Sequence, residues 1–123
     1  MRTRSLVSIV DDDESVRESL PDLLRQLGFA AEAFASADAF LTSHFVDETR
    51  CLILDITMPG MSGPELQREL VSRGRSTPTI FITASADKTL RPRLMAEGAV
   101  AVLFKPFSDA ALLDSLNIAF GRN

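Results

Sequence analysis

Short apolar runs alternate with longer segments of helical period along the whole chain. The runs have almost no polar alternation, which is typical of strands covered on both faces. In the longer segments apolar residues recur three or four positions apart, which indicates helices with one apolar face. The expected strands cover residues 5–10, 30–34, 50–54, 79–83 and 100–104. The expected helices cover residues 14–27, 37–43, 64–73, 88–97 and 108–120.

Residues that begin and end helices stand at several of these boundaries. Asp12 or Asp13 can cap the first helix and Ser36 the second, because a side-chain oxygen there accepts from a free backbone N–H. Gly28 suits the left-handed residue that ends the first helix. Pro21 lies inside that helix and removes a hydrogen bond. It therefore predicts either a kink or a later start.

Five strand–helix pairs in 123 residues predict one α/β domain covering residues 1–123. Right-handed crossovers and this count suit a doubly wound five-stranded parallel sheet of order 2-1-3-4-5, a flavodoxin-like three-layer sandwich. In such a sheet, binding sites form outside the carboxyl ends of the strands. Those ends are where candidate chemistry should be sought.

Composition narrows the classes of function. The net charge is −4 and Lys and Arg are not clustered, so we expect no direct nucleic-acid binding by this domain. No apolar run approaches the ~18 residues that span a bilayer, so we expect no membrane segment. The single cysteine, Cys51, lies in an apolar run and predicts an inert core thiol. These features favour a reducing, cytoplasmic setting. The only histidine, His44, is expected at the surface.

Polar residues follow four of the expected strands. Asp11 and Asp12 follow the first, Asp55 the third, Thr83 ends the fourth and Lys105 follows the fifth. Taken singly, each has an ordinary explanation. The Asp pair would be charges at the start of a helix, Asp55 a turn residue, Thr83 a strand residue and Lys105 a surface lysine. Together they predict one shallow site, if their strands are neighbours.

Close carboxylates repel one another and raise a pKa unless a cation neutralises them. Mg²⁺ prefers such oxygen ligands and also holds phosphate oxygens. Asp55 can then attack phosphorus to form an acyl phosphate, with Thr83 donating a hydrogen bond and Lys105 supplying charge. The site is therefore suited to phosphoryl transfer.

These motifs resemble the receiver domain of two-component response regulators. The resemblance is carried by Asp11-Asp12, by Asp55 before Ile-Thr-Met-Pro-Gly-Met-Ser-Gly, by Thr83-Ala84 and by Lys105-Pro106-Phe107. The resemblance covers essentially the whole chain, and the sequence around these motifs is similar to the FixJ/NarL-type branch of the family. It implies two-component signal transduction: a phosphoacceptor that assists its own phosphorylation and dephosphorylation but is a switch rather than an enzyme.

The resemblance also implies roles for single residues. Asp55 is the implied phosphoacceptor, which receives its group from a sensor histidine kinase. Asp12 and Asp55 are the implied direct Mg²⁺ ligands, with Asp11 acting through water and Thr57 through its backbone carbonyl. Residues that contact or follow the phosphoryl group are Thr83, Ala84 and Lys105, and the Lys105–Pro106 bond is implied to be cis.

The implied output surface consists of helix 88–97, strand 100–104 and helix 108–120, and it can also form a homodimer.

One position departs from the family pattern. Three residues before the lysine the family places an aromatic residue or histidine that moves inward with the threonine, whereas this chain has Val102. Valine is short and stiff at χ1, so the usual aromatic reporter of phosphorylation is missing. Phe104 lies on the same face of the strand and is a candidate replacement.

Two other functions use the same residues. An aspartyl-phosphate hydrolase generally carries a second Asp two residues after the nucleophile, where this chain has Thr57, which cannot act as acid or base. A receiver that no longer cycles, and acts only through its output surface, is suggested by Val102. The chain is expected to be either a stand-alone receiver or the first domain of a longer regulator, whose further part would then be a DNA-binding effector.

Overall fold

The computed structural model describes residues 4–121, in which five strands and five helices alternate. The strands are β1 (Leu6–Val10), β2 (Ala30–Phe34), β3 (Thr49–Asp55), β4 (Thr79–Thr83) and β5 (Ala101–Phe104). The helices are α1 (Glu14–Gln26), α2 (Ala37–Leu41), α3 (Gly63–Ser72), α4 (Leu90–Ala96) and α5 (Asp109–Ala119). Hydrophobic periodicity therefore predicted the type and order of every element in this part of the chain.

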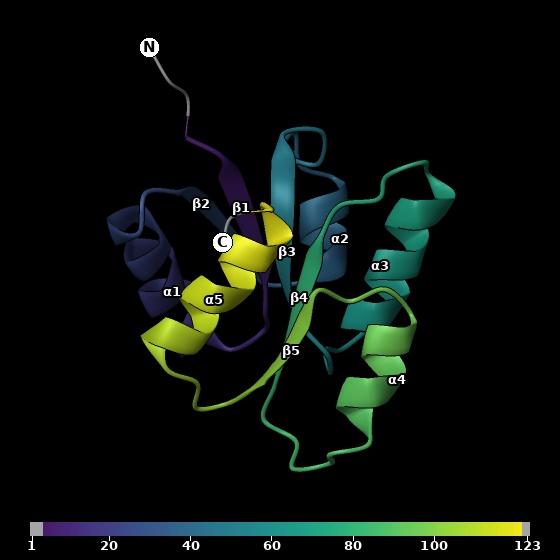
Figure 1. The fold of residues 1–123 in the computed structure, drawn as a ribbon. Helices are drawn as coiled ribbons and strands as arrows, with labels where there is room; N and C mark the ends of the chain where they lie inside the picture. Colours follow the sequence, from purple (N-terminus) through teal and green to yellow (C-terminus); the bar gives the residue numbers. More distant parts are fainter. Residues whose placement is uncertain (1–3, 122–123) are drawn as a thin grey trace.

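The strands form one parallel sheet in the order β2-β1-β3-β4-β5 (Figure 1). This confirms the doubly wound, flavodoxin-like prediction. Because all strands run the same way, their carboxyl ends share one edge, the lower edge in Figure 1. Within residues 4–121, no helix combines the length and the apolar character that a membrane crossing requires.

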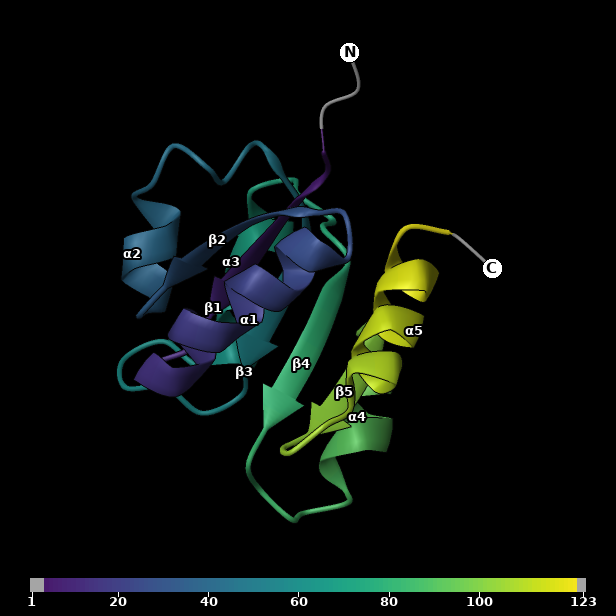
Figure 2. The same cartoon turned by 90° about the vertical axis from the view of Figure 1, so that its left-hand side faces the viewer.

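Helices cover both faces of the sheet. α1 and α5 lie on one face, and α2, α3 and α4 lie on the other, which Figure 2 shows from the side. Side chains of a strand alternate between faces, so Cys51 and Ile53 pack with α1 and α5, whereas Leu52 and Leu54 pack with the other three helices. The buried thiol confirms Cys51 as a core residue, and burial raises its pKa to about 12. His44 is exposed, as expected.

The start of α1 agrees with the predicted range 14–27, whereas the extent of α4 corrects the prediction. α1 begins at Glu14, capped by Asp13 through a 3.0 Å bond from the backbone N–H of Ser15, and it continues past Pro21. The alternative of a later start was therefore wrong. α4 covers seven residues rather than 88–97, because the residues before Leu90 form a loop and Thr89 gives no side-chain cap. Helical period alone did not reveal this competing loop.

A buried pair of hydroxyl groups joins β1 to β3. The Ser8 and Thr49 hydroxyls are 2.7 Å apart, and the Thr49 hydroxyl also donates to the backbone carbonyl of Phe45 at 2.7 Å. Because the single hydroxyl proton of Thr49 is used at Phe45, Ser8 is the donor within the pair. The Phe45 carbonyl also accepts from the backbone N–H groups of Glu48 and Thr49, so the group that depends on the Thr49 hydroxyl is the buried hydroxyl of Ser8.

We expect Thr49→Val to lower the free energy of unfolding by about 1–3 kcal/mol, because valine leaves the buried Ser8 hydroxyl without its acceptor, while the Phe45 carbonyl keeps its backbone donors. The control Ser8→Ala leaves the Thr49–Phe45 bond in place and should lose roughly 1 kcal/mol or less. Urea unfolding of both variants measures the difference. Equal losses would contradict this assignment of donors.

Candidate functional site

Three carboxylates meet at the carboxyl edge of the sheet. Asp11 follows β1 directly, Asp12 is the next residue, and Asp55 is the last residue of the adjacent strand β3. Each offers an oxygen, and these oxygens lie within 4.8 Å of one another. Asp11 is fully buried and Asp55 nearly so, whereas Asp12 is exposed. The cluster is thus open to solvent on the Asp12 side.

Lys105 brings a positive charge to this cluster from the far strand. Its Nζ donates to Oδ2 of Asp11 at 2.9 Å, and its backbone N–H donates to the carbonyl of Thr83 at 2.7 Å. Burial disfavours the ammonium, but the hydrogen bond and charge of Asp11 outweigh it and raise the pKa of Lys105. The Lys105–Pro106 bond is cis, as the family resemblance implies.

Asp55 is the unusual acid of the group. Burial, followed by the negative charge of Asp11, raises its pKa to about 7, although Lys105 acts in the opposite direction. Three carboxylates therefore face one ammonium among the described residues, and a second cation would relieve the remaining repulsion. An all-oxygen donor set of this size, open on one side, fits a hard divalent ion such as Mg²⁺.

The other predicted site residues surround the cluster. Thr83 is buried, and its hydroxyl accepts from the backbone N–H of Ser85 at 3.0 Å. Ala84 and Thr57 are exposed at the same edge, after β4 and β3 respectively. Val102 is fully buried in β5, so its side chain faces the core. The roles assigned to these residues stay predictions.

Two residues that sequence reasoning missed hold this edge together. Arg17 donates from Nη1 to the backbone carbonyl of Asp11 at 3.0 Å, which ties the first turn of α1 to the end of β1. A Cβ at Gly63 would overlap the carbonyl oxygen of Asp55, so glycine is required where α3 begins against β3. Gly63 could have been suspected, because two glycines closely follow Asp55, but only the packing shows which one is confined.

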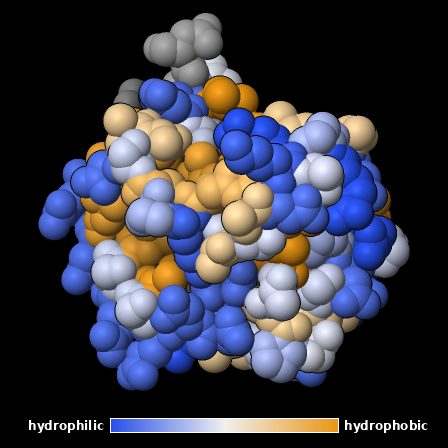
Figure 3. Space-filling view, turned by 90° about the horizontal axis from the view of Figure 1, so that it is seen from below, coloured by the Kyte–Doolittle hydropathy of each residue, from blue (hydrophilic) through white to orange (hydrophobic). Residues whose placement is uncertain are grey.

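The face of the molecule at this edge carries both hydrophilic and hydrophobic surface. Figure 3 views it from below, where hydrophilic residues cover much of the face and hydrophobic surface gathers towards the side of α1 and α5.

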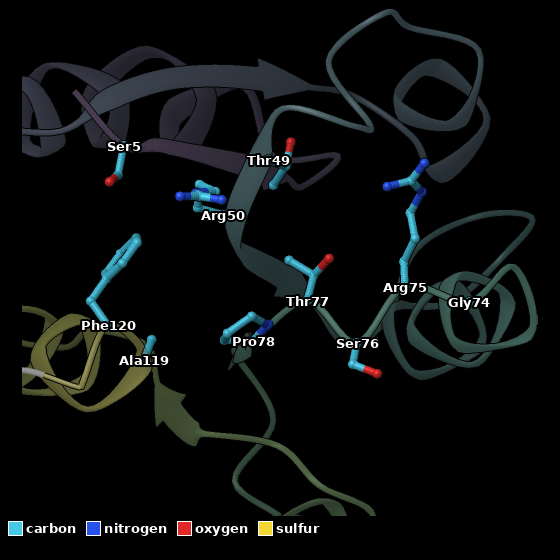
Figure 4. A pocket seen from close by; sticks show the side chains of 10 residues that line it. All are labelled: Ser5, Thr49, Arg50, Gly74, Arg75, Ser76, Thr77, Pro78, Ala119 and Phe120. Carbon is cyan, nitrogen blue, oxygen red and sulfur yellow. The ribbon is translucent and has the colours of Figure 1, made fainter. Parts of the chain in front are cut away.

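A pocket of about 470 Å³ lies at the other edge of the sheet, lined by residues such as Arg50, Arg75 and Phe120 (Figure 4). It contains none of the predicted site residues, and Arg75 is already paired with Asp47.

The raised pKa of Asp55 predicts a pH-dependent stability. Well below pH 4 this carboxyl is protonated in both the folded and the unfolded protein. Between about pH 4 and 7 the unfolded chain ionises it while the folded protein keeps it protonated, so the free energy of unfolding falls over this range and levels off above about pH 7. In chelator, Asp55→Asn should therefore be more stable than wild type by about 2–4 kcal/mol at pH 8, and nearly equal at about pH 4. Urea unfolding across this range measures the trend.

Asp114→Asn removes an exposed carboxyl on α5 and is the control for the loss of one negative charge. A constant difference between Asp55→Asn and wild type at every pH would contradict the shifted pKa.

Comparison with known proteins places this site in a family. The family model for the response regulator receiver domain matches residues 7–117. Nodulation protein W of Bradyrhizobium diazoefficiens is 43% identical over 121 residues, which cover 98% of this chain and 53% of that protein. The transcriptional regulatory protein FixJ of Azorhizobium caulinodans is 40% identical over 117 residues, with 95% and 56% covered.

The crystal structure of FixJ-N is similar in fold, with a TM-score of 0.84, 38% identity, and coverage of all of this chain and 98% of that one. The chain spans about half the length of the curated relatives it matches. The fold, the site and these matches agree with the resemblance inferred from the motifs. The chain belongs to the response regulator receiver domain family of two-component signalling.

Proposed function

We propose that Asp55 accepts a phosphoryl group from a phosphohistidine of a sensor kinase, in the presence of Mg²⁺. The observation that carries this proposal is the cluster of Asp11, Asp12 and Asp55 oxygens within 4.8 Å of one another, with Lys105 bound to Asp11. This arrangement favours a phosphoacceptor over an aspartyl-phosphate hydrolase. Such a hydrolase needs a second acid two residues after Asp55, and Thr57 at that position cannot act as one.

The residues divide the chemistry among them. An oxygen of Asp55 attacks phosphorus, a P–O bond forms, and the P–N bond to the donor imidazole breaks. Lys105 supplies positive charge to the incoming phosphoryl oxygens. The Thr83 hydroxyl accepts from the backbone N–H of Ser85, so its own proton can be donated to the phosphoryl group. Mg²⁺ held by Asp11, Asp12, Asp55 and the Thr57 carbonyl would neutralise the carboxylates and the phosphoryl charge.

We extend this proposal to the output. Phosphorylation would change the surface formed by α4, β5 and α5, through which the domain contacts a partner or a second copy of itself. FixJ is named a transcriptional regulatory protein. By analogy we propose that this domain controls a DNA-binding effector rather than binding DNA itself, consistent with its net charge of −4.

Incubation with acetyl phosphate and Mg²⁺ should give one phosphoryl adduct by intact mass. We expect the adduct to be labile to hydroxylamine, as an acyl phosphate is, and to be absent with chelator or in Asp55→Asn. Lys105→Ala should slow its formation by at least about tenfold, because a charge-stabilising donor is lost. An adduct that persists in Asp55→Asn would place the phosphoacceptor elsewhere. No adduct with any metal would favour a receiver that no longer cycles.

Mg²⁺ should also stabilise the folded protein. At about a hundred times its dissociation constant, a ligand that binds only the folded state adds about 2.7 kcal/mol. We expect Asp12→Asn to lose most of this gain in urea unfolding, because the exposed Asp12 carboxylate belongs to the cluster. Asp13→Asn is the matched control, since Asn caps a helix as well as Asp does. An equal loss of the gain in both variants would argue against a specific site.

A further inference from the structure

A run of local hydrogen bonds joins the phosphoacceptor site to α4. The Thr83 hydroxyl accepts from the backbone N–H of Ser85 at 3.0 Å, and the Ser85 hydroxyl accepts from that of Asp87 at 3.1 Å. Asp87 in turn accepts from the backbone N–H of Thr89 at 3.0 Å and from its hydroxyl at 2.6 Å. Every second residue of the loop is therefore tied to the next, so a displacement of Thr83 is transmitted to the start of α4.

The start of α4 packs against the core through the partly buried Leu90 and contacts β5 through Arg91. The helix has seven residues, Leu94 is its one buried side chain, and Thr89 does not cap it. In the first turn, Arg91 donates from Nη2 to the backbone carbonyl of Val102 at 3.0 Å. Its guanidinium also lies 5.9 Å from the centroid of the Phe104 ring, within cation–π range. Arg91 thus contacts β5 twice.

The Arg91–Phe104 contact lies beside the phosphoacceptor site. Phe104 is two residues after Val102, and both side chains pack on the face of the sheet that α4 covers. A pocket of about 560 Å³ next to them is lined by the loop after β4 and by Arg91, Phe104 and Lys105. Lys105 is the residue that pairs with Asp11. The pocket therefore connects the ion pair of the site with the contact that holds α4.

We propose that Arg91 is a positioning residue that couples phosphorylation of Asp55 to α4, in place of an aromatic side chain at position 102. This inference rests on the proposed function. When Thr83 moves towards the phosphoryl group to donate its hydroxyl proton, Ser85 and the hydrogen-bonded loop follow it and pull on the first turn of α4, so that Arg91 leaves Val102 and Phe104. The surface of α4 and β5 changes because that contact opens.

Beryllofluoride, a phosphoryl mimic, with Mg²⁺ tests the coupling in wild type and Arg91→Ala. Occupancy is measured by fluorine NMR, and the response by amide hydrogen exchange of residues 84–96. In wild type we expect bound beryllofluoride to speed exchange of the amides of residues 94–96, which bond to carbonyls in the first turn of α4, by roughly tenfold, the amount that loss of both Arg91 contacts implies. Arg91→Ala should exchange at that faster rate without the mimic and change less than about twofold on binding it.

Two variants separate coupling from a general effect of charge or stability. Arg93→Ala removes the same charge from α4 but leaves the contacts of Arg91 with Val102 and Phe104 in place, so the wild-type response should remain. Arg91→Lys keeps the charge without the planar fork and should restore part of the response.

The outcomes are distinct. A wild-type response in Arg91→Ala, or its equal loss in Arg93→Ala, overturns the role of Arg91 while leaving phosphoryl acceptance at Asp55 intact. Absence of bound beryllofluoride in wild type instead contradicts the proposed function, and the inference with it. Bound mimic in both proteins, with the response lost only in Arg91→Ala, establishes the coupling.

Discussion

Electrostatic repulsion among three carboxylates is the constraint on which the functional edge of this domain depends. Asp11 is fully buried, and it is accommodated because Lys105 and the backbone N–H of Asp13 both donate to its carboxylate. Asp55 has no ammonium bound to it in this way, and its pKa rises to about 7. Burial, and after it the negative charge of Asp11, makes ionised Asp55 unfavourable in the folded protein, and a cation bound to the cluster would offset both this cost and the charge of an incoming phosphoryl group.

The parallel sheet makes this arrangement possible, because it collects side chains from strands that are distant in sequence. Asp11 and Lys105 are 94 residues apart, yet they follow β1 and β5 at the same edge. Backbone contacts then fix the edge: Arg17 holds the end of β1, and the close approach of Gly63 holds the end of β3. Site and fold are therefore interdependent, since the carboxylates converge only when the strands adopt this order.

The loop after β4 and the helix that follows it are built differently from the rest. α1, α3 and α5 each begin at a residue whose side chain accepts from the helix backbone, whereas α4 has no such cap and buries one side chain. A short, uncapped helix opens at lower free energy than a packed core element, which suits a surface that must change. Besides the apolar contacts of Leu90 and Leu94 with the core, Arg91 gives α4 two contacts with β5.

The sequence by itself determined the class of fold, the order of the elements and the members of the carboxylate cluster. Apolar runs marked each strand, and Asp11, Asp55 and Lys105 followed those runs, so a parallel sheet had to bring them to one edge. Only the tertiary structure decided the short extent of α4, the confinement of Gly63 and the contacts of Arg91 with β5. These features depend on distances between segments that are separate in sequence, and local periodicity carries no information about such distances.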